Sequence, residues 1–286
     1  MIEREGHRGT PPDQDRGVPN PGGHAPGSHG AGRLLAVALP EIPEVRPGDD
    51  LGRLVAEAWW SLTVADPALA PQPGDVLVVT QKVVSKAEGR LVQLAEVEPR
   101  PEAVAFAAAW GKDARQVEVV LRESTDVLRM ERGLIISRTR HGFVCANAGV
   151  DASNVGAEDV VTLLPDDPDG SAAMLRERIY EELGVYVHVI VSDSFGRPWR
   201  WGITDVAVGV AGFLPLDDLR GTPDAGGRTM HATIVAVADQ LASVAELASG
   251  KTSRRPLVLI RGASLRDGYG SVQRDVVMSS EDDLFP

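Results

Sequence analysis

Short, almost purely apolar runs are the feature that most limits how this chain can fold. The runs VYVHVIV, from residue 185, and VAVGVAG, from residue 206, are rich in Val, and two further runs begin with DVLVV and PLVLI. Apolar runs of this length with β-branched residues are typical of strands buried on both faces. We therefore expect strands over residues 75–84, 185–193, 204–212 and 256–262, with shorter ones over 133–137 and 143–149.

Segments with apolar residues at helical spacing alternate irregularly with these strands. The first of these segments begins at the capping residues Asp49 and Asp50. Another follows the acidic turn PDDPDGS and ends at Gly184. Because helices and strands do not alternate strictly, the order favours an α+β fold, with mixed sheets and packed helices, over a regular doubly wound fold. The expected helices are residues 49–62, 101–112, 116–130, 169–184 and 231–250.

Composition excludes several classes of protein. The chain has 286 residues, of which 29 are basic and 41 acidic, and its net charge of −12 argues against a nucleic-acid partner or an anionic membrane surface. The single cysteine, Cys145, excludes an internal disulfide framework and a cysteine-based zinc site. No apolar run approaches the ~20 residues that span a bilayer, and no hydrophobic signal core is present, so we expect a cytoplasmic protein.

The first 32 residues differ from the rest of the chain. They are rich in Gly and Pro and have almost no apolar side chains, so they cannot offset the entropy cost of becoming ordered. We expect a disordered extension over residues 1–32 and one folded domain over residues 33–286.

Polar side chains follow two of the expected strands. Ser192, Asp193 and Ser194 come directly after VYVHVIV, and the segment CANAGVDASNV brings Asp151 and Asn154 after another strand. Carboxylate and hydroxyl oxygens of this kind suit Mg²⁺ or Mn²⁺ bound to nucleotide phosphates. The alternative, which a lone aspartate favours, is that Asp193 only caps a turn.

Basic side chains follow a third expected strand. Lys82, Lys86 and Arg90 lie in and after the run QKVVSKAEGR, where they are candidates to hold phosphate oxygens, with a solvated basic face as the alternative. The segment SGKTS, from residue 249, resembles the end of a phosphate-binding P-loop. Its first glycine would have to be Ala245, inside an expected helix, so a true P-loop is excluded. Acidic and basic strand ends together indicate metal-assisted phosphoryl chemistry.

Six segments, in this order, resemble one protein family. They are LPEIPEVRPGDDL, VVSKAEGR, RHGFVCANAGVDASNV, DPDGSA, VSDSFGRPWRWGITDVAVGVAG and the terminal EDDLF. Over residues 34–285 the chain is thus similar to the coenzyme F-420-0:L-glutamate ligase (gamma-glutamyl ligase) family. The resemblance implies a family-specific α+β fold and an intertwined homodimer. It also implies a GTP-dependent ligase that adds L-glutamate to the lactyl-phosphate side chain of the deazaflavin precursor through an acyl phosphate.

Cofactors and binding residues are implied by the same resemblance. GTP is the nucleotide substrate, Mg²⁺ or Mn²⁺ the metal, and a monovalent cation such as K⁺ a further ligand. Asp151 and Asp193 match carboxylates that bind the first metal, and Ser194 matches a hydroxyl ligand of the second. The nucleotide-contacting positions that match are Leu39, Pro40, Glu41, Ile42, Gln81, Lys82, Lys86, Asn154, Ser249, Gly250, Lys251, Thr252, Ser253, Arg254, Arg255 and Pro256.

One position departs from the family pattern. Some members place an acidic metal ligand where this chain has Lys251, and a protonated lysine cannot coordinate a cation. Either the second metal is held differently, or Lys251 neutralises charge at the phosphates instead.

The segment between the two Val-rich runs completes the expected site. We expect Asp193 to act in catalysis together with Arg197 and Arg200, which meet phosphate or carboxylate groups. Trp199 and Trp201 offer flat faces for stacking on a deazaflavin or guanine ring, with packing in the core or a dimer interface as the alternative.

Two other functions explain part of the same pattern. A kinase or hydrolase that uses a metal and a nucleotide on another small acid needs the same acidic and basic strand ends. A non-catalytic deazaflavin-binding protein needs no metal site at all.

Overall fold

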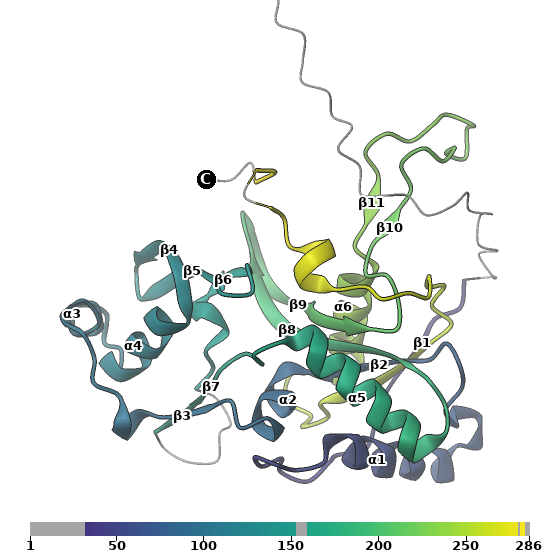
Figure 1. Ribbon diagram of the computed structural model, residues 1–286, viewed down its shortest axis with the longest axis horizontal. Coiled ribbons are helices and arrows are strands. Elements are labelled where there is room, and N and C mark those ends of the chain that lie inside the picture. The colour runs from purple at the N-terminus through teal and green to yellow at the C-terminus, as the bar shows by residue number, and fades with distance from the viewer. Residues whose placement is uncertain (1–31, 153–158, 280, 284–286) are drawn as a thin grey trace, which may run out of the picture.

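The apolar runs form a central sheet of five strands in the order β1-β12-β2-β8-β9 (Figure 1). The computed structural model describes residues 32–152, 159–279 and 281–283. Neighbours β2 and β8 run parallel and the other three pairs antiparallel, so the sheet is mixed. The strands are β1 (Leu35–Ala38), β2 (Val76–Thr80), β8 (His188–Arg197), β9 (Arg200–Ala211) and β12 (Leu257–Arg261).

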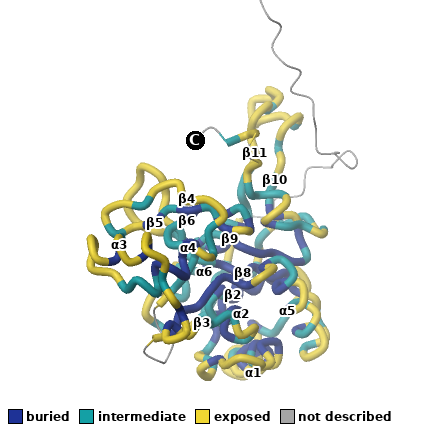
Figure 2. The backbone as a smooth tube through the Cα atoms, turned by 60° about the vertical axis from the view of Figure 1, so that its left-hand side comes forward, coloured by how far each residue is buried: buried dark blue, intermediate teal, exposed yellow. Residues whose placement is uncertain are grey.

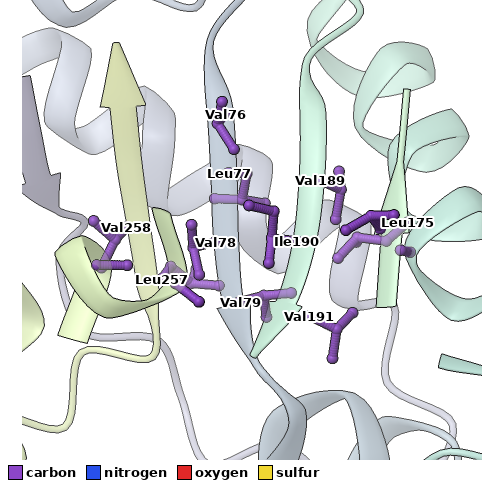
Figure 3. Close-up of a cluster of buried hydrophobic side chains, with 14 of the residues drawn as sticks. Val76, Leu77, Val78, Val79, Leu175, Val189, Ile190, Val191, Leu257 and Val258 are labelled. Carbon is purple, nitrogen blue, oxygen red and sulfur yellow. The ribbon is translucent and has the colours of Figure 1, made fainter. Parts of the chain in front are cut away.

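Helices cover the sheet. α1 (Leu51–Ala65) packs against α5 (Pro168–Leu183), which contacts β8 and β9, while α6 (Val237–Ser249) contacts β9, β12 and β1. Successive strand residues point to opposite faces, and all of Val76–Val79 are buried, so both faces are covered. Figure 3 shows the resulting core, in which side chains of β2 lie between those of β12 and β8, and Leu175 of α5 lies beside β8. Figure 2 shows the same strands as the buried centre of the molecule.

Smaller elements flank the sheet. Beside the β8–β9 hairpin lies a group with its own apolar core, which includes Ala103, Val120 and Ile135 (Figure 1). This group consists of β3 (Leu91–Gln93), α3 (Pro101–Trp110), α4 (Ala114–Glu123), β4 (Ser124–Glu131), β5 (Leu134–Thr139), β6 (Val144–Ala146), the short turn η3 (Asn147–Gly149) and β7 (Val160–Thr162).

Two further segments complete the fold. A hairpin arm projects from the molecule, with β10 (Asp217–Asp218) and β11 (Ile234–Val235) paired at its base (Figure 1). A one-turn π-helix, η4 (Val272–Val276), lies near the C-terminal end and follows β12. In the part of the chain that the structure describes, no helix has both the length and the apolar character needed to cross a membrane.

The helices expected over 49–62, 101–112 and 169–184 are confirmed as α1, α3 and α5. The ends of α1 and α5 follow local chemistry. The side chain of Asp50 accepts a hydrogen bond from the Arg53 amide at 3.1 Å, which caps α1. Asp167 caps α5 in the same way, so the acidic turn is a helix cap. Gly184 ends α5 with φ of 70°, a conformation that favours glycine. The fold class, α+β with mixed sheets and packed helices, is also confirmed.

Several sequence-based boundaries were wrong. The strand expected over 143–149 ends at Ala146, where the turn η3 begins, and the strand expected over 185–193 starts only at His188. The strand expected over 75–84 ends at Thr80, and Gln81 begins helix α2 (Gln81–Ala87), because an apolar run alone does not distinguish strand from buried helix. The helix expected over 116–130 ends at Glu123, and the residues after it pair with β5 as strand β4. The helix expected over 231–250 begins only at Val237, since Ile234 and Val235 pair with β10.

The charged and aromatic segment after VYVHVIV does not interrupt the strands. β8 and β9 continue through it as one long hairpin, whose pairing extends to Arg197 and Arg200. Pro198 and Trp199 form the turn, and Trp199 has a φ of 56°. The segment is therefore the far half of a hairpin that extends beyond the buried sheet.

Candidate functional site

Four sequence segments meet at one end of the central sheet, where β2 and β8 finish and β12 begins. We call this end of the strands the sheet edge. Because β2 and β8 are parallel, with Thr80 opposite Ser192, their carboxyl ends lie side by side. The antiparallel strand β12 starts at this edge, where the Thr80 amide donates to the Pro256 carbonyl at 3.0 Å. β1 ends there as well, since the Leu39 amide donates to the Leu257 carbonyl at 2.9 Å. The predicted segments 39–42, 81–86, 193–194 and 249–256 therefore lie around one edge.

Asp193 is a carboxyl group placed where ionisation is costly. It follows the buried part of β8 and lies opposite Val206 of β9. Burial raises its pKa to about 7, and the neighbouring carboxylates of Asp205 and Asp151 add to this rise, while the Ser194 amide opposes it. A bound cation would remove this cost by supplying the missing positive charge.

Asp151 and Lys82 form an ion pair. The Lys82 Nζ atom lies 2.6 Å from Asp151 Oδ2, and both side chains are partly buried. Lys82 lies in the first turn of α2, while Asp151 pairs with Thr162 just after the turn η3. The sequence placed these two residues at separate strand ends, and the structure joins them.

The turn before Asp151 has an unusual backbone. Asn147, Ala148 and Gly149 all have positive φ values of 53°, 52° and 71°. A Cβ atom on Gly149 would lie 2.7 Å from Leu164 Cγ, so only glycine fits there. Left-handed residues other than glycine are concentrated at functional sites, where the surrounding structure holds them. The turn fixes the direction in which the chain enters Asp151.

A second polar group lies at the base of the β8–β9 hairpin. Ser194 Oγ donates to Asp205 Oδ1 at 2.6 Å, and Ser192 Oγ donates to Asp205 Oδ2 at 3.3 Å. The Lys251 ammonium contacts Ser194 Oγ, Glu246 Oε1 at 2.9 Å and Asp205 Oδ1 at 3.4 Å. Asp205 and Glu246 of this group were not predicted from the sequence. The register of the hairpin, which sets Asp205 opposite Ser194, was the signal that could have found the first of them.

The other basic residues predicted for this site have different surroundings. Lys86 is buried and pairs with Glu44 at 2.5 Å, so the alternative of a solvated basic face is wrong for this lysine. Arg90 donates to the Leu164 carbonyl at 3.0 Å and pairs with Glu123 and Asp166. Arg90 thus ties the chain after α2 to the segment after β7.

Several predicted nucleotide contacts have limited access. Leu39 and Gln81 are buried, the Leu39 amide is bonded to the Leu257 carbonyl, and Gln81 accepts a hydrogen bond from Ser85 at 2.8 Å, so neither residue is open to a ligand in this structure. Glu41 is exposed, as is most of the loop 249–256. Asn154 lies outside the described residues.

The arginines predicted to act with Asp193, and the tryptophans predicted to stack on a ring, lie at or beside the turn of the β8–β9 hairpin. Arg197 is at the turn of the hairpin, four residues beyond Asp193, and its guanidinium donates to the Trp201 carbonyl at 3.1 Å. Trp199 and Trp201 are 84% and 100% exposed, which excludes core packing within the chain. A catalytic role for Arg197 and Arg200 stays a prediction.

Comparison with known proteins identifies the family. The model of F420-0:Gamma-glutamyl ligase matches residues 40–262. The chain belongs to the F420-0:gamma-glutamyl ligase family. It is 44% identical to Coenzyme F420:L-glutamate ligase of Methanothermobacter thermautotrophicus over 80% of this chain and 89% of that protein. It is 46% identical to the Methanopyrus kandleri protein of the same name over 81% of this chain and 89% of that protein. For the Archaeoglobus fulgidus protein the identity is 39%, over 88% and 96% of the two chains.

The cysteine of this gamma-glutamyl ligase family member is not a nucleophile. Cys145 is buried, and burial raises the pKa of its thiol to about 12, with the Asp193 carboxylate as a smaller cause. At neutral pH the thiol therefore stays protonated and unreactive. Cys145 therefore acts as a small buried apolar residue.

The donor atoms at the sheet edge suit one divalent cation better than two. Among the described residues, no group of three His, Cys, Asp or Glu side chains is close enough to hold a metal ion by itself. Asp193 and Asp151 nevertheless interact as like charges, and such a pair, together with phosphate oxygens, is a typical Mg²⁺ or Mn²⁺ environment. A second cation at Ser194 would have to displace the Lys251 ammonium from three donors, Ser194, Asp205 and Glu246, whereas a first cation has to displace Lys82 only from Asp151 Oδ2.

Proposed function

We propose that this protein is a GTP-dependent ligase that joins L-glutamate to the deazaflavin coenzyme precursor F420-0. Membership of the family and the printed names of its relatives support this reaction. The observation that carries the proposal is the convergence of the predicted nucleotide and metal segments at one edge of the sheet. There, Lys82 pairs with Asp151 and Lys251 pairs with Asp205. Asp193 lies close enough to Asp151, Asp205 and Lys251 to interact with their charges.

The reaction has two steps. In the first, an oxygen of the acceptor carboxylate bonds to the γ-phosphorus of GTP, the bond to the β,γ-bridging oxygen breaks, and GDP leaves. In the second, the amine of L-glutamate bonds to the acyl carbon, inorganic phosphate leaves, and the amine loses a proton. Both steps depend on holding the reactants in line and on balancing charge, so no nucleophilic side chain is needed.

Residues at the sheet edge have distinct roles in this proposal. Asp151 and Asp193 hold one Mg²⁺ or Mn²⁺, which supplies positive charge for the phosphate oxygens. Lys82 is fixed beside Asp151 and presents a second positive charge at the same edge. The segments 39–42 and 249–256 border the nucleotide, with contacts from exposed side chains such as Glu41 and from backbone groups.

We also propose that the protein forms a homodimer. The hairpin turn exposes Trp199 and Trp201, and Ile203 beside them is 54% exposed. Large exposed apolar residues grouped in this way are typical of an interaction surface. The projecting arm of β10 and β11 offers a second surface for a partner. A dimer gives the hairpin turn a neighbouring chain to pack on, and sedimentation equilibrium at micromolar concentration tests it.

Mass spectrometry of the acceptor tests the reaction. Purified protein is incubated with the deazaflavin precursor, GTP, Mg²⁺ and L-glutamate, and the proposal expects the acceptor to gain one or more glutamyl residues. Parallel samples lack GTP, glutamate or acceptor. Nucleotide turnover without acceptor would instead support a hydrolase, and phosphorylated acceptor without glutamate addition would support a kinase. Binding of the deazaflavin with no turnover would support a non-catalytic binding protein.

A further inference from the structure

The ammonium group of Lys251 is held by oxygen atoms from three different elements. It contacts Ser194 Oγ of β8, Asp205 Oδ1 of β9 at 3.4 Å and Glu246 Oε1 of α6 at 2.9 Å. Lys251 follows Gly250, which ends α6 with a φ of 69° and turns the chain back toward the sheet. The lysine stem is thus directed across the base of the hairpin.

The oxygens around this ammonium are fixed by other hydrogen bonds. Asp205 is buried and accepts hydrogen bonds from both Ser192 and Ser194. Glu246 uses its other oxygen, Oε2, to accept the Asp205 amide at 3.1 Å. Neither carboxylate can rotate away without breaking these bonds, so the group persists whether or not the lysine is present.

Such a group of oxygens is suited to a divalent cation. Two carboxylates and a hydroxyl are hard donors of the kind that Mg²⁺ and Mn²⁺ accept, with water or phosphate oxygens completing the shell. An ammonium in the same position contacts the same lone pairs and excludes the ion. The buried Asp205 carboxylate needs a positive partner in either case, because a buried charge without one is costly.

We infer that Lys251 is a built-in cation that takes the place of a second divalent cation between Ser194, Asp205 and Glu246. The inference rests on the proposed function for its role beside the nucleotide phosphates. It predicts that positive charge at this position does not depend on metal concentration. The chain then takes up one divalent cation fewer than it would with a neutral residue at position 251.

Counting bound Mn²⁺ on the full-length protein tests this inference. Binding of Mn²⁺ alone is followed by the loss of the free-ion electron paramagnetic resonance signal and by calorimetry. We expect Lys251→Ala to bind one Mn²⁺ per chain more than the parent, whereas Lys251→Arg, which keeps the charge, gains none. The double variant Lys251→Ala/Glu246→Gln should lose the added ion, because one of its donors is gone. Circular dichroism shows that each variant is folded, which the 54% exposure of the Lys251 side chain leads us to expect.

The outcomes separate this inference from the proposed function. Equal Mn²⁺ counts for the parent and Lys251→Ala would overturn the inference, as would an added ion that survives the Glu246→Gln change. Glutamate addition by the parent is measured separately. If the parent ligates glutamate but Lys251→Ala binds no more Mn²⁺ than the parent, only the role of Lys251 is refuted. A gain of one ion in a protein that never ligates glutamate refutes only the proposed reaction.

Discussion

Replacing Asp193 with asparagine tests whether Asp193 binds a metal ion or only caps a turn. The pKa of this carboxyl rises from its ordinary 3.8 to about 7 in the folded protein. Each pH unit corresponds to about 1.4 kcal/mol, so ionised Asp193 costs the metal-free protein about 4 kcal/mol. Asparagine has nearly the same shape and no charge, so Asp193→Asn should stabilise the metal-free protein above pH 7 by up to this amount.

The pH dependence of this effect has a definite sign. Because the folded state holds the Asp193 proton more tightly than the unfolded state, its stabilising contribution is complete below about pH 4 and is lost as pH rises to about 7. The variant has no such proton to lose. The difference in free energy of unfolding between variant and parent should therefore grow between pH 4 and 7 and then level off. Urea unfolding in excess chelator at several pH values measures it.

Activity provides the second half of the test. With the carboxylate gone, the cation site loses a formal charge, and removal of a key electrostatic contributor costs roughly 10²-fold in rate. Asp239→Asn is the matched control. Burial also raises the pKa of Asp239, which accepts the Ala207 amide at 3.0 Å, so it should gain stability without losing glutamate-dependent GTP turnover. An Asp193→Asn protein that turns over within a few-fold of the parent, or whose stability difference is independent of pH, would refute the assignment.

Three further changes test other parts of the molecule. Lys86→Ala should raise the KM for GTP with little change in fold, whereas Glu44→Gln, which removes only its partner, should not; equal KM values for parent and Lys86→Ala would exclude a phosphate contact. Deleting residues 1–32 should leave the melting temperature and activity nearly unchanged, because the segment has almost no apolar side chains to bury, and a large drop in melting temperature would contradict this. Glu118→Gln should lower the free energy of unfolding, measured with urea, by about 1–2 kcal/mol. Hydrogen bonds from Arg100 hold the pKa of Glu118 at about 2, and the expected energy is reduced because the exposed Arg100 side chain is screened by solvent. The parent should lose this contribution as pH falls from about 4.5 to 2, and an unchanged urea midpoint at neutral pH would show that the pair contributes nothing.

Helix ends marked by a capping residue were predicted better than ends that rest on the apolar pattern alone. Asp50, Asp167 and Gly184 cap helices where the sequence places them, because capping depends on residues within one turn. The run DVLVVTQKVV, in contrast, is apolar on both sides of Thr80. Its change from strand to helix depends on the packing of α2 against β8 and β2, which a single segment does not reveal.

The candidate site shows the same limit. The sequence predicted four site residues because each lies in a polar segment after an apolar strand: Lys82, Asp151, Asp193 and Ser194. Which of them pair was not readable, because the contact of Lys82 with Asp151 depends on how β7 and α2 are placed in space. Glu246 lies inside an ordinary amphipathic helix and has no local signal at all. Its role depends on contacts made across the fold.

The outer edge of strand β9 is closed to a further strand by carboxylates of α5 and α6. Three outward amides of this edge strand donate to carboxylates instead of to another strand: Asp205 to Glu246, Ala207 to Asp239 and Val210 to Asp169. An edge whose amides are already bonded to charged groups is a poor template for adding a strand. A second copy of the chain therefore does not extend the sheet through this part of β9. The proposed dimer instead uses the exposed hairpin turn and the projecting arm, and the same bond that closes the edge at Asp205 also holds Glu246 in place beside Lys251.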